Sequence, residues 1–251
     1  MNILLVNDDG IYAEGIIKLA EALKDGHRVV IAAPDKQCSG FASSMYHRIT
    51  VKKADLGISG VTAYKVAGTP VNCATIGVQK LFPGADAVIS GINAGRNAGP
   101  DILYSGTVGA ALEAALYGYR SIAVSLRTSD HMKESFLYSA DFMKRNLDNL
   151  CSMPIPEQSF ININFPSELP PRGIRTARAA ETDIKDYLSF AGEGDPDCKE
   201  TVYTVSGRIK KPVYAEGTDL LAVKEGYISL SVLKIARDVS VPEAHISDLV
   251  L

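Results

Sequence analysis

Short apolar runs alternate with amphipathic segments through the first two thirds of the chain. The first run, Ile3 to Val6, stops at a polar segment that contains glycine, which is typical of a buried parallel strand. Four later runs have the same character. We therefore predict strands at 1–6, 28–33, 87–90, 121–126 and 160–165.

Between consecutive strands, apolar residues spaced three and four apart predict helices. Gly26 is placed to end the first helix, and Thr69 and Pro70 supply an N-cap and a first-turn proline for the second. Strands that alternate with helices favour a doubly wound, mostly parallel α/β sheet. The apolar stripes are Ile16, Leu19, Ala20 and Leu23; Val71, Ala74, Val78 and Leu81; Val108, Ala111, Leu112 and Ala115; and Phe136, Ala140, Met143 and Leu147.

Three segments depart from this alternation and have β character. Residues 46–66 are expected to form an extended hairpin. Residues 182–212 combine short β-prone pieces with glycine and proline, which predicts a projecting hairpin, and 227–233 has the pattern of a late strand. Strand edges exposed by a projecting hairpin need a cover, and a second subunit would supply one. The apolar tail from Val239 to Leu251 is a second candidate for docking on a partner subunit.

Composition places the chain among ordinary globular proteins. Its 251 residues are 46% hydrophobic and 22% charged, which is enough apolar material for a sizeable core. We expect a single α/β domain over 1–251, with the core at about 1–180 and a hairpin and tail extension at about 181–251. The 26 basic and 29 acidic residues give a net charge of −3, so no nucleic acid duplex is expected as a partner.

Cysteine usage and the amino terminus indicate the compartment. The spacing of the cysteines fits neither a zinc pairing nor a disulfide framework, which favours a reducing environment. The amino terminus lacks the basic flank of a signal peptide, and no apolar run approaches about 18 residues, so we expect a cytoplasmic protein without a membrane-spanning helix. The four cysteines are Cys38, Cys73, Cys151 and Cys198.

Polar residues follow three of the predicted strands. The segments Asn7 to Gly10, Pro34 to Gly40 and Ser90 to Asn93 leave strands whose carboxyl ends meet at one sheet edge, where ligands bind in open parallel sheets. Adjacent carboxylates with hydroxyl and amide oxygens suit Mg²⁺, Mn²⁺ or Ca²⁺ rather than zinc. Taken alone, Asp8 and Asp9 have an alternative interpretation as a capped turn that leads into a helix.

A second group of polar residues begins a predicted helix. Tyr104 to Val108 contains two hydroxyls and a glycine, and the free backbone N–H groups of a helix start attract anions such as phosphate. The preceding segment, Gly91 to Gly99, permits close backbone approach and offers two amides. The alternative is that Ser105 or Thr107 is only an N-cap.

Several catalytic signatures are absent from the sequence. There is no Gly-Lys pair, so the phosphate-binding loop of nucleoside triphosphatases is excluded. Asp8 and Asp9 would repel a dinucleotide pyrophosphate, which disfavours nicotinamide chemistry. There is no Gly-X-Ser-X-Gly turn, and the four histidines are scattered, so a serine hydrolase has little support.

The ordered set of these motifs resembles the survival protein SurE family. The resemblance covers nearly the whole chain, and the set is far more specific than any one member. The chain departs from the family at Asn72 and Ala114, where Asp and Gly are common; both lie in predicted helices outside the metal set. The motifs are Asn7-Asp8-Asp9-Gly10, Gln37-Cys38-Ser39-Gly40, Gly68-Thr69-Pro70, Ser90-Gly91-Ile92-Asn93, Tyr104-Ser105-Gly106-Thr107-Val108, Asn162-Ile163-Asn164-Phe165-Pro166 and Gly217-Thr218-Asp219.

This resemblance implies a Rossmann-like core, a projecting carboxyl-terminal part exchanged in a homodimer or homotetramer, and metal-dependent hydrolysis of nucleoside 5′-monophosphates. Hydrolysis of 3′-monophosphates and short polyphosphate would extend this activity. The positions that match the family's metal site are Asp8, Asp9, Ser39 and Asn93, which would hold one divalent cation per subunit, Mg²⁺ or Mn²⁺.

From these residues we predict a phosphomonoesterase that uses metal-activated water. Asp8 and Asp9 are the expected catalytic residues, and one of them would act as general base. The 46–66 hairpin or a neighbouring subunit is the expected source of a base pocket. Two alternatives stay open: a phosphatase with a covalent aspartyl phosphate, and a non-catalytic nucleotide sensor. The expected phosphate-binding residues are Asn93, Asn97, Ser105, Gly106 and Thr107.

Overall fold

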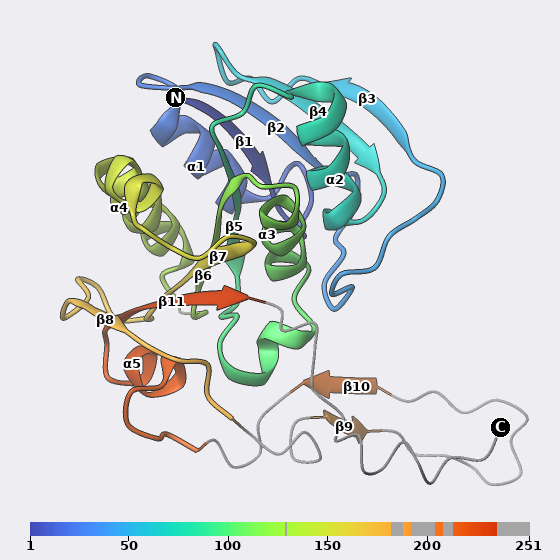
Figure 1. The fold of residues 1–251 in the computed structure, drawn as a ribbon. Coiled ribbons are helices and arrows are strands. Elements are labelled where there is room, and N and C mark those ends of the chain that lie inside the picture. The colour runs from blue at the N-terminus through green and yellow to red at the C-terminus, as the bar shows by residue number, and fades with distance from the viewer. Residues whose placement is uncertain (129, 182–187, 192–203, 208–212, 235–251) are drawn as a thin grey trace, which may run out of the picture.

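The computed structural model describes residues 1–128, 130–181, 188–191, 204–207 and 213–234, and its ribbon is drawn in Figure 1. A nine-stranded sheet runs through the molecule in the order β3-β4-β2-β1-β5-β6-β7-β11-β8. Its strands are β1 (Asn2–Val6), β2 (Arg28–Pro34), β3 (Thr50–Ala54), β4 (Thr62–Ala67), β5 (Ala87–Ala94), β6 (Arg120–Leu126), β7 (Ser159–Phe165), β8 (Ile174–Thr176) and β11 (Ile228–Lys234).

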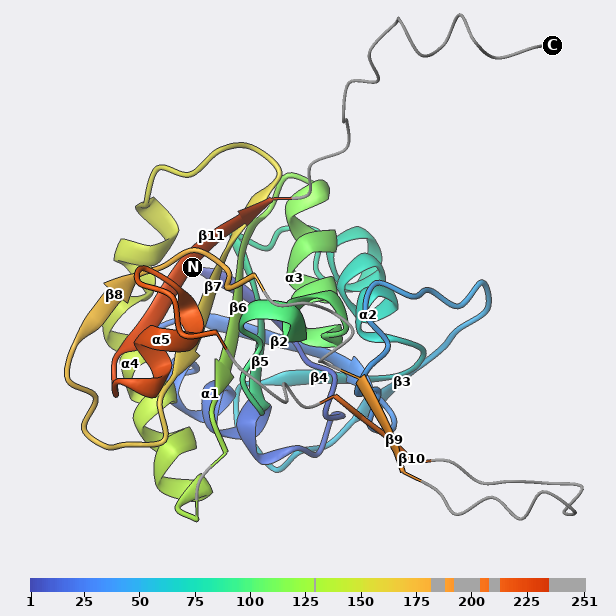
Figure 2. The ribbon, with the colours of Figure 1, turned by 90° about the horizontal axis from the view of Figure 1, so that it is seen from below.

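Helices cover both faces of this sheet, as Figures 1 and 2 show. One face packs against α1 and α4 through a large apolar cluster, and the other against α2 and α3 through a second cluster. The helical elements are α1 (Glu14–Leu23), α2 (Pro70–Ile76), the π-helical turn η1 (Gly77–Leu81), the 3₁₀ turn η2 (Gly99–Leu103), α3 (Gly106–Leu116), α4 (Met132–Ser152) and α5 (Asp219–Lys224).

The predicted doubly wound, mostly parallel sheet is confirmed. The six strands from β4 to β7 pair in parallel, while β3 is antiparallel to β4 and β11 is antiparallel to β7. The apolar stripe of α1 is fully buried, because Ile16, Leu19 and Leu23 all face the sheet. The second predicted helix begins at the expected cap: Thr69 and Asn72 form a reciprocal capping box, with Pro70 in the first turn.

The structure differs from the sequence prediction at several elements. We expected a loop from Gly91, but β5 continues to Ala94 through a register shift between Ser90 and Asn93. Strand β8 was not predicted because all three of its residues are exposed, so it has no apolar pattern. Helix α5 is only six residues long, which is too short to show a periodic stripe.

The projecting hairpin is described only in part. Strands β9 (Leu188–Ala191) and β10 (Thr204–Gly207) pair antiparallel in a separate two-stranded sheet. The other residues of 182–212, Cys198 among them, lie outside the described residues, as does the tail from Val239 to Leu251. Assembly through these segments and the division at about residue 180 therefore stay predictions. Among the described residues, no helix is both long and apolar enough to cross a bilayer.

Candidate active site

The predicted metal ligands meet at one pocket on the carboxyl edge of the parallel strands. The pocket has a volume of about 260 Å³ and receives residues from the segments after β1 and β2, from the end of β5, from η2 and from the start of α3. It is lined by Asp8, Asp9, Gln37, Ser39, Gly40, Asn93, Ala94, Arg96, Asn97, Asp101, Tyr104 and Ser105. All four expected metal ligands and two of the other expected phosphate-binding residues thus lie round a single cavity.

Asp8 is the most buried acidic group of this pocket, with 4% of its surface exposed. Burial raises the pKa of its carboxyl to about 6, and the charge of Asp9 adds to the rise, while a hydrogen bond from Thr107 opposes it. The Thr107 hydroxyl donates to Asp8 Oδ1 at 2.5 Å and fixes the orientation of the carboxylate. Burial removes hydration from this carboxylate, so a nearby cation would stabilise its charged form.

Gly106 makes room for the Asp8 carboxylate. A Cβ atom at this position would lie 2.9 Å from Asp8 Cβ and Pro70 Cγ and 3.1 Å from Asp8 Oδ2. Real Cβ atoms do not approach other carbon atoms this closely, so a side chain here would displace Asp8 or α2. Gly106 therefore shapes the pocket from behind, without lining it.

We expect Gly106→Ala to lower the phosphatase activity that the sequence predicts between about tenfold and a hundredfold, because small displacements of a reacting group have effects of this size. Alanine favours helices over glycine, so weakened helix formation would not account for the loss. The measurement is kcat with saturating Mg²⁺. Gly26→Ala is the matched control, since its Cβ would meet no described atom within 4 Å. Equal activity of the two variants would contradict this role.

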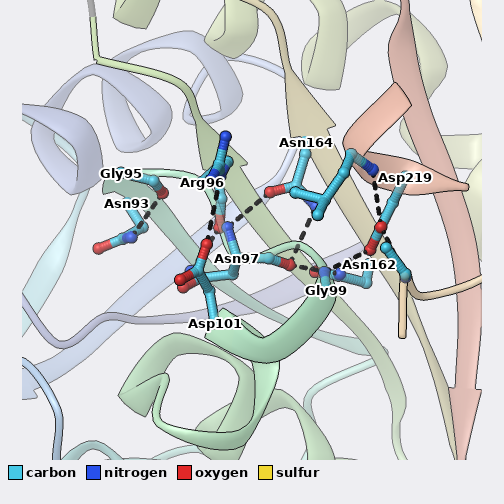
Figure 3. A network of polar contacts seen from close by, with 12 residues as sticks. Asn93, Gly95, Arg96, Asn97, Gly99, Asp101, Asn162, Asn164 and Asp219 are labelled. Carbon is cyan, nitrogen blue, oxygen red and sulfur yellow. Dashed lines mark hydrogen bonds and ion pairs between the residues drawn. The ribbon is translucent and has the colours of Figure 1, made fainter. Parts of the chain in front are cut away.

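Asp9, Ser39 and Asn93 complete the group of oxygen donors. The backbone N–H of Ala94 donates to Asp9 Oδ2 at 3.2 Å, and burial raises the pKa of Asp9. The side-chain nitrogen of Asn93 donates to the Gly95 carbonyl at 2.7 Å, so its oxygen points away from that loop, as Figure 3 shows. Ser39 accepts a hydrogen bond from the Gln37 amide at 3.0 Å.

A buried asparagine network holds Asn97 in place (Figure 3). The Asn97 backbone N–H donates to Asn164 Oδ1 at 2.7 Å, and its carbonyl accepts from Asn162 at 2.9 Å and Asn164 at 3.2 Å. The Asn97 side-chain nitrogen donates to Ser125 Oγ at 2.7 Å. Strands β6 and β7 therefore fix the loop that connects β5 to η2.

Asp219 anchors the next turn of this loop. Its carboxylate is fully buried and accepts hydrogen bonds from the backbone N–H groups of Gly99 at 2.8 Å and Ala180 at 2.9 Å. Burial raises the pKa of Asp219, while these bonds and the charge of Arg96 lower it. The sequence predicted no role for Asp219 except as a member of the Gly217-Thr218-Asp219 motif. Its partner Gly99 lies 120 residues away, so no local sequence pattern links the two residues.

The start of α3 forms the opposite wall of the pocket. Ser105 lines the pocket and caps the helix, because its Oγ accepts a hydrogen bond from the Val108 N–H at 3.0 Å. Thr107 does not reach the pocket: its side chain is fully buried behind Asp8. Of the expected phosphate-binding residues, Asn93, Asn97 and Ser105 thus line the cavity, whereas Gly106 and Thr107 support it.

The donor set fits a hard divalent cation. Within the described part of the chain, no three His, Cys, Asp or Glu side chains gather as a metal cluster. The pocket instead offers two carboxylates, a hydroxyl and an amide oxygen, which are ligands for Mg²⁺ or Mn²⁺. The buried charge of Asp8 and the cradle at Gly106 are the features that such a cation would complete.

Known proteins of similar sequence fall in one family. The family model described as "Survival protein SurE" matches residues 3–187. The chain is 37% identical to a protein named 5′-nucleotidase SurE from Thermoanaerobacter sp., over 92% of this chain and 91% of that protein. A Clostridium botulinum protein of the same name is 39% identical, over 93% of this chain and 92% of that protein.

A solved structure extends the likeness to three dimensions. The crystal structure of the SurE protein from Aquifex aeolicus superposes with a TM-score of 0.79 and 32% sequence identity, and the match covers 95% of each chain. Sequence, fold and pocket therefore lead to one conclusion: this chain belongs to the SurE family.

Proposed function

We propose that this protein is a divalent-metal-dependent 5′-nucleotidase that hydrolyses nucleoside 5′-monophosphates to nucleoside and phosphate. The observation that carries the proposal is the single pocket in which Asp8, Asp9, Ser39 and Asn93 meet the start of α3. Two relatives that match almost the whole chain are named 5′-nucleotidase SurE, which supports the same reaction.

In this proposal, Asp8, Asp9, Ser39 and Asn93 hold one Mg²⁺ or Mn²⁺. The ion would supply a Lewis acid for phosphate oxygens and lower the pKa of water. Thr107 keeps the Asp8 carboxylate oriented through its 2.5 Å hydrogen bond. One of the two aspartates accepts the proton of the attacking water.

The start of α3 and the Asn97 loop receive the phosphate. Ser105 lies on the pocket wall at the amino end of α3, and the positive end of the helix dipole favours an anion there. The side chain of Asn97 also lines the pocket, held by Ser125. These groups are placed before the reaction begins, so they stabilise the charge that develops on the phosphate oxygens.

The first test is removal of the metal. We expect phosphate release from adenosine 5′-monophosphate to fall about a hundredfold or more after dialysis against a chelator, since metal assistance supplies several kcal/mol. Added Mg²⁺ or Mn²⁺ restores the rate. Full activity after complete chelation, verified by metal analysis, would overturn the proposal, and release from none of the monophosphates tested would favour a nucleotide sensor.

Rapid quenching with labelled substrate separates the two phosphatase mechanisms. Water attack leaves no phosphoryl group on the protein, so rapid quenching with labelled substrate is expected to trap none. An acid-stable phosphoryl group on Asp8 would establish the covalent route instead.

A panel of 5′- and 3′-monophosphates and short polyphosphate is expected to show a preference for 5′-monophosphates with broad tolerance of the base.

A further inference from the structure

Arg96 brings a positive charge to the pocket that contains Asp8 and Asp9. Of the described residues that line this pocket, Arg96 is the only cation, whereas Asp8, Asp9 and Asp101 supply three carboxylates. When all of them are ionised, these carboxylates and the guanidinium have a formal charge of −2, which one divalent cation would balance. Without the charge of Arg96, the pocket would stay negative even with a divalent cation bound and would repel a phosphate dianion.

An ion pair with Asp101 holds one edge of the Arg96 guanidinium (Figure 3). The N–H on Nε donates to Asp101 Oδ2 at 3.2 Å. The side chains of Arg96 and Asp101 are 27% and 18% exposed, so water screens this pair less than a pair on the open surface. Among the described residues, no other acceptor takes a hydrogen bond from Arg96. The N–H groups on Nη1 and Nη2 are therefore available to a ligand.

The ion pair joins two segments of backbone that are anchored elsewhere. Asn97, the next residue along the chain, is held by the asparagines of β7, and Gly95 forms a β-bridge with Leu126 at the end of β6. Asp101 lies in η2, whose first residue is bound by Asp219. The guanidinium is thus placed before a ligand enters, so binding costs little conformational entropy.

The available N–H groups have the geometry and charge that a phosphate group needs. A guanidinium is planar, and its paired N–H groups bind the oxygens of phosphate in bidentate fashion. The neighbours of Arg96 in the sequence belong to the same site: Asn93 is a proposed metal ligand, and Asn97 lines the pocket beside Ser105. An anion that contacts Asn97 and Ser105 would therefore lie in the same pocket as the guanidinium.

We propose that Arg96 is a further phosphate-binding residue of this site, which holds non-bridging phosphate oxygens through Nη1 and Nη2. The inference rests on the proposed function and adds a charged group to the expected phosphate-binding residues. These oxygens are present in the substrate and in the product alike, so Arg96 lowers KM and contributes little to kcat. The contact does not involve the leaving group, so it serves any phosphate monoester equally.

Arg96→Gln removes the charge and the fork of N–H groups. We expect it to raise KM for adenosine 5′-monophosphate between about tenfold and a hundredfold and to change kcat less than about threefold, because a hydrogen bond to a charged group is lost. The same rise in KM is expected for p-nitrophenyl phosphate, which has no nucleoside. A rise for the nucleotide alone, or for neither substrate, would overturn the assignment.

Arg145→Gln is the matched control. The Nε of Arg145 pairs with Asp141 Oδ2 at 2.8 Å, so the ion pair is of the same type, but it is exposed on α4 and does not line the pocket. KM is expected to stay unchanged in this variant, and a rise as large as in Arg96→Gln would contradict the proposal.

Arg96→Lys keeps the positive charge and loses the planar fork. Its KM is expected to lie between those of Arg96→Gln and the unmodified protein, and it carries the comparison if Arg96→Gln folds poorly. A KM for Arg96→Lys as high as that for Arg96→Gln would contradict an electrostatic role for Arg96.

Binding of inorganic phosphate separates this inference from the proposed function, because it needs no turnover. Isothermal titration of the Mg²⁺-loaded protein with phosphate is expected to show an affinity that falls about tenfold or more in Arg96→Gln. The affinity for Mg²⁺ and Tm are expected to stay close to those of the unmodified protein, which a purely structural role of the ion pair would not allow.

This pattern would support Arg96 as a phosphate-binding residue even if the protein hydrolysed none of the esters tested. Equal phosphate affinity of Arg96→Gln and the unmodified protein, or no phosphate binding by the unmodified protein, would exclude the assignment. Metal-dependent turnover by the unmodified protein would in that case leave the proposed function intact.

Discussion

Asp8→Asn is expected to abolish metal-dependent phosphate release and, at the same time, to stabilise the metal-free protein at neutral pH. Activity is lost because a neutral amide replaces a carboxylate that would hold the cation. Stability rises because the Asp8 carboxylate is buried, with a pKa raised from 3.8 to about 6. The amide oxygen can still accept the hydrogen bond from Thr107, so the local packing is kept.

The direction of the pH dependence follows from this raised pKa. Between about pH 4 and 6 the folded protein holds a proton on Asp8 that the unfolded chain has lost, so the free energy of unfolding falls as the pH rises through this range. At pH 7 the full penalty is present, on the order of 2–3 kcal/mol, and Asp8→Asn removes it. A gain of this size raises Tm by roughly 5 °C in a protein of this length.

Thermal unfolding of the metal-free protein at pH 4.5 and pH 7 measures this effect. We expect Asp8→Asn to be the more stable protein at pH 7 and the difference to shrink at the lower pH. Mg²⁺ is expected to raise Tm of the unmodified protein and leave the variant unchanged, because only a state that binds the ion is stabilised by it. Asp35→Asn, at an exposed carboxylate that follows β2, is the control. Near-normal phosphate release by the folded variant at saturating Mg²⁺ or Mn²⁺ would contradict the assignment of Asp8.

The site was largely predictable because its main residues follow strand ends. Parallel strands bring their carboxyl ends together, so the order of residues alone led us to expect Asp8, Ser39 and Asn93 at one sheet edge. The same reasoning failed for the groups behind the pocket. Thr107 was expected to bind phosphate, yet its hydroxyl donates to Asp8, and no local pattern in the sequence distinguishes these two uses of a hydroxyl.

The supporting network was not predictable for a related reason. The side chains of Asn162 and Asn164 bind backbone groups of Asn97, 65 and 67 residues away. A polar residue in a buried strand shows that it needs a partner, but the sequence does not name that partner. A second pocket, of about 470 Å³ beside the start of α3, was not predicted for the same reason, because its walls include residues from the loop after β2, from η2, α3, β7 and β11.

Asp219→Ala is expected to have the largest effect on stability outside the pocket itself. The fully buried carboxylate accepts N–H groups of Gly99 and Ala180, and its loss leaves both without this partner. Each buried donor without an acceptor costs about 1–3 kcal/mol, so the expected loss is on the order of 4 kcal/mol. The stability of Asp219→Asn is expected to lie between those of Asp219→Ala and the unmodified protein. The single side-chain oxygen of the asparagine can keep the hydrogen bond from Ala180, but its amide nitrogen cannot accept a hydrogen bond from the N–H of Gly99.

Activity is expected to fall with stability, because Asp219 holds the turn that begins at Gly99. Displacement of this turn moves Asp101, which lines the pocket that contains Asp8 and Asp9. Denaturant unfolding gives the free energy, and turnover per folded molecule gives the effect on the site. Asp141→Ala is the matched control, since Asp141 forms an exposed ion pair with Arg145, and such pairs contribute less than about 1 kcal/mol. If Asp219→Ala were no less stable than this control, its carboxylate would not anchor the turn, and the asparagines of β7 would hold the loop alone.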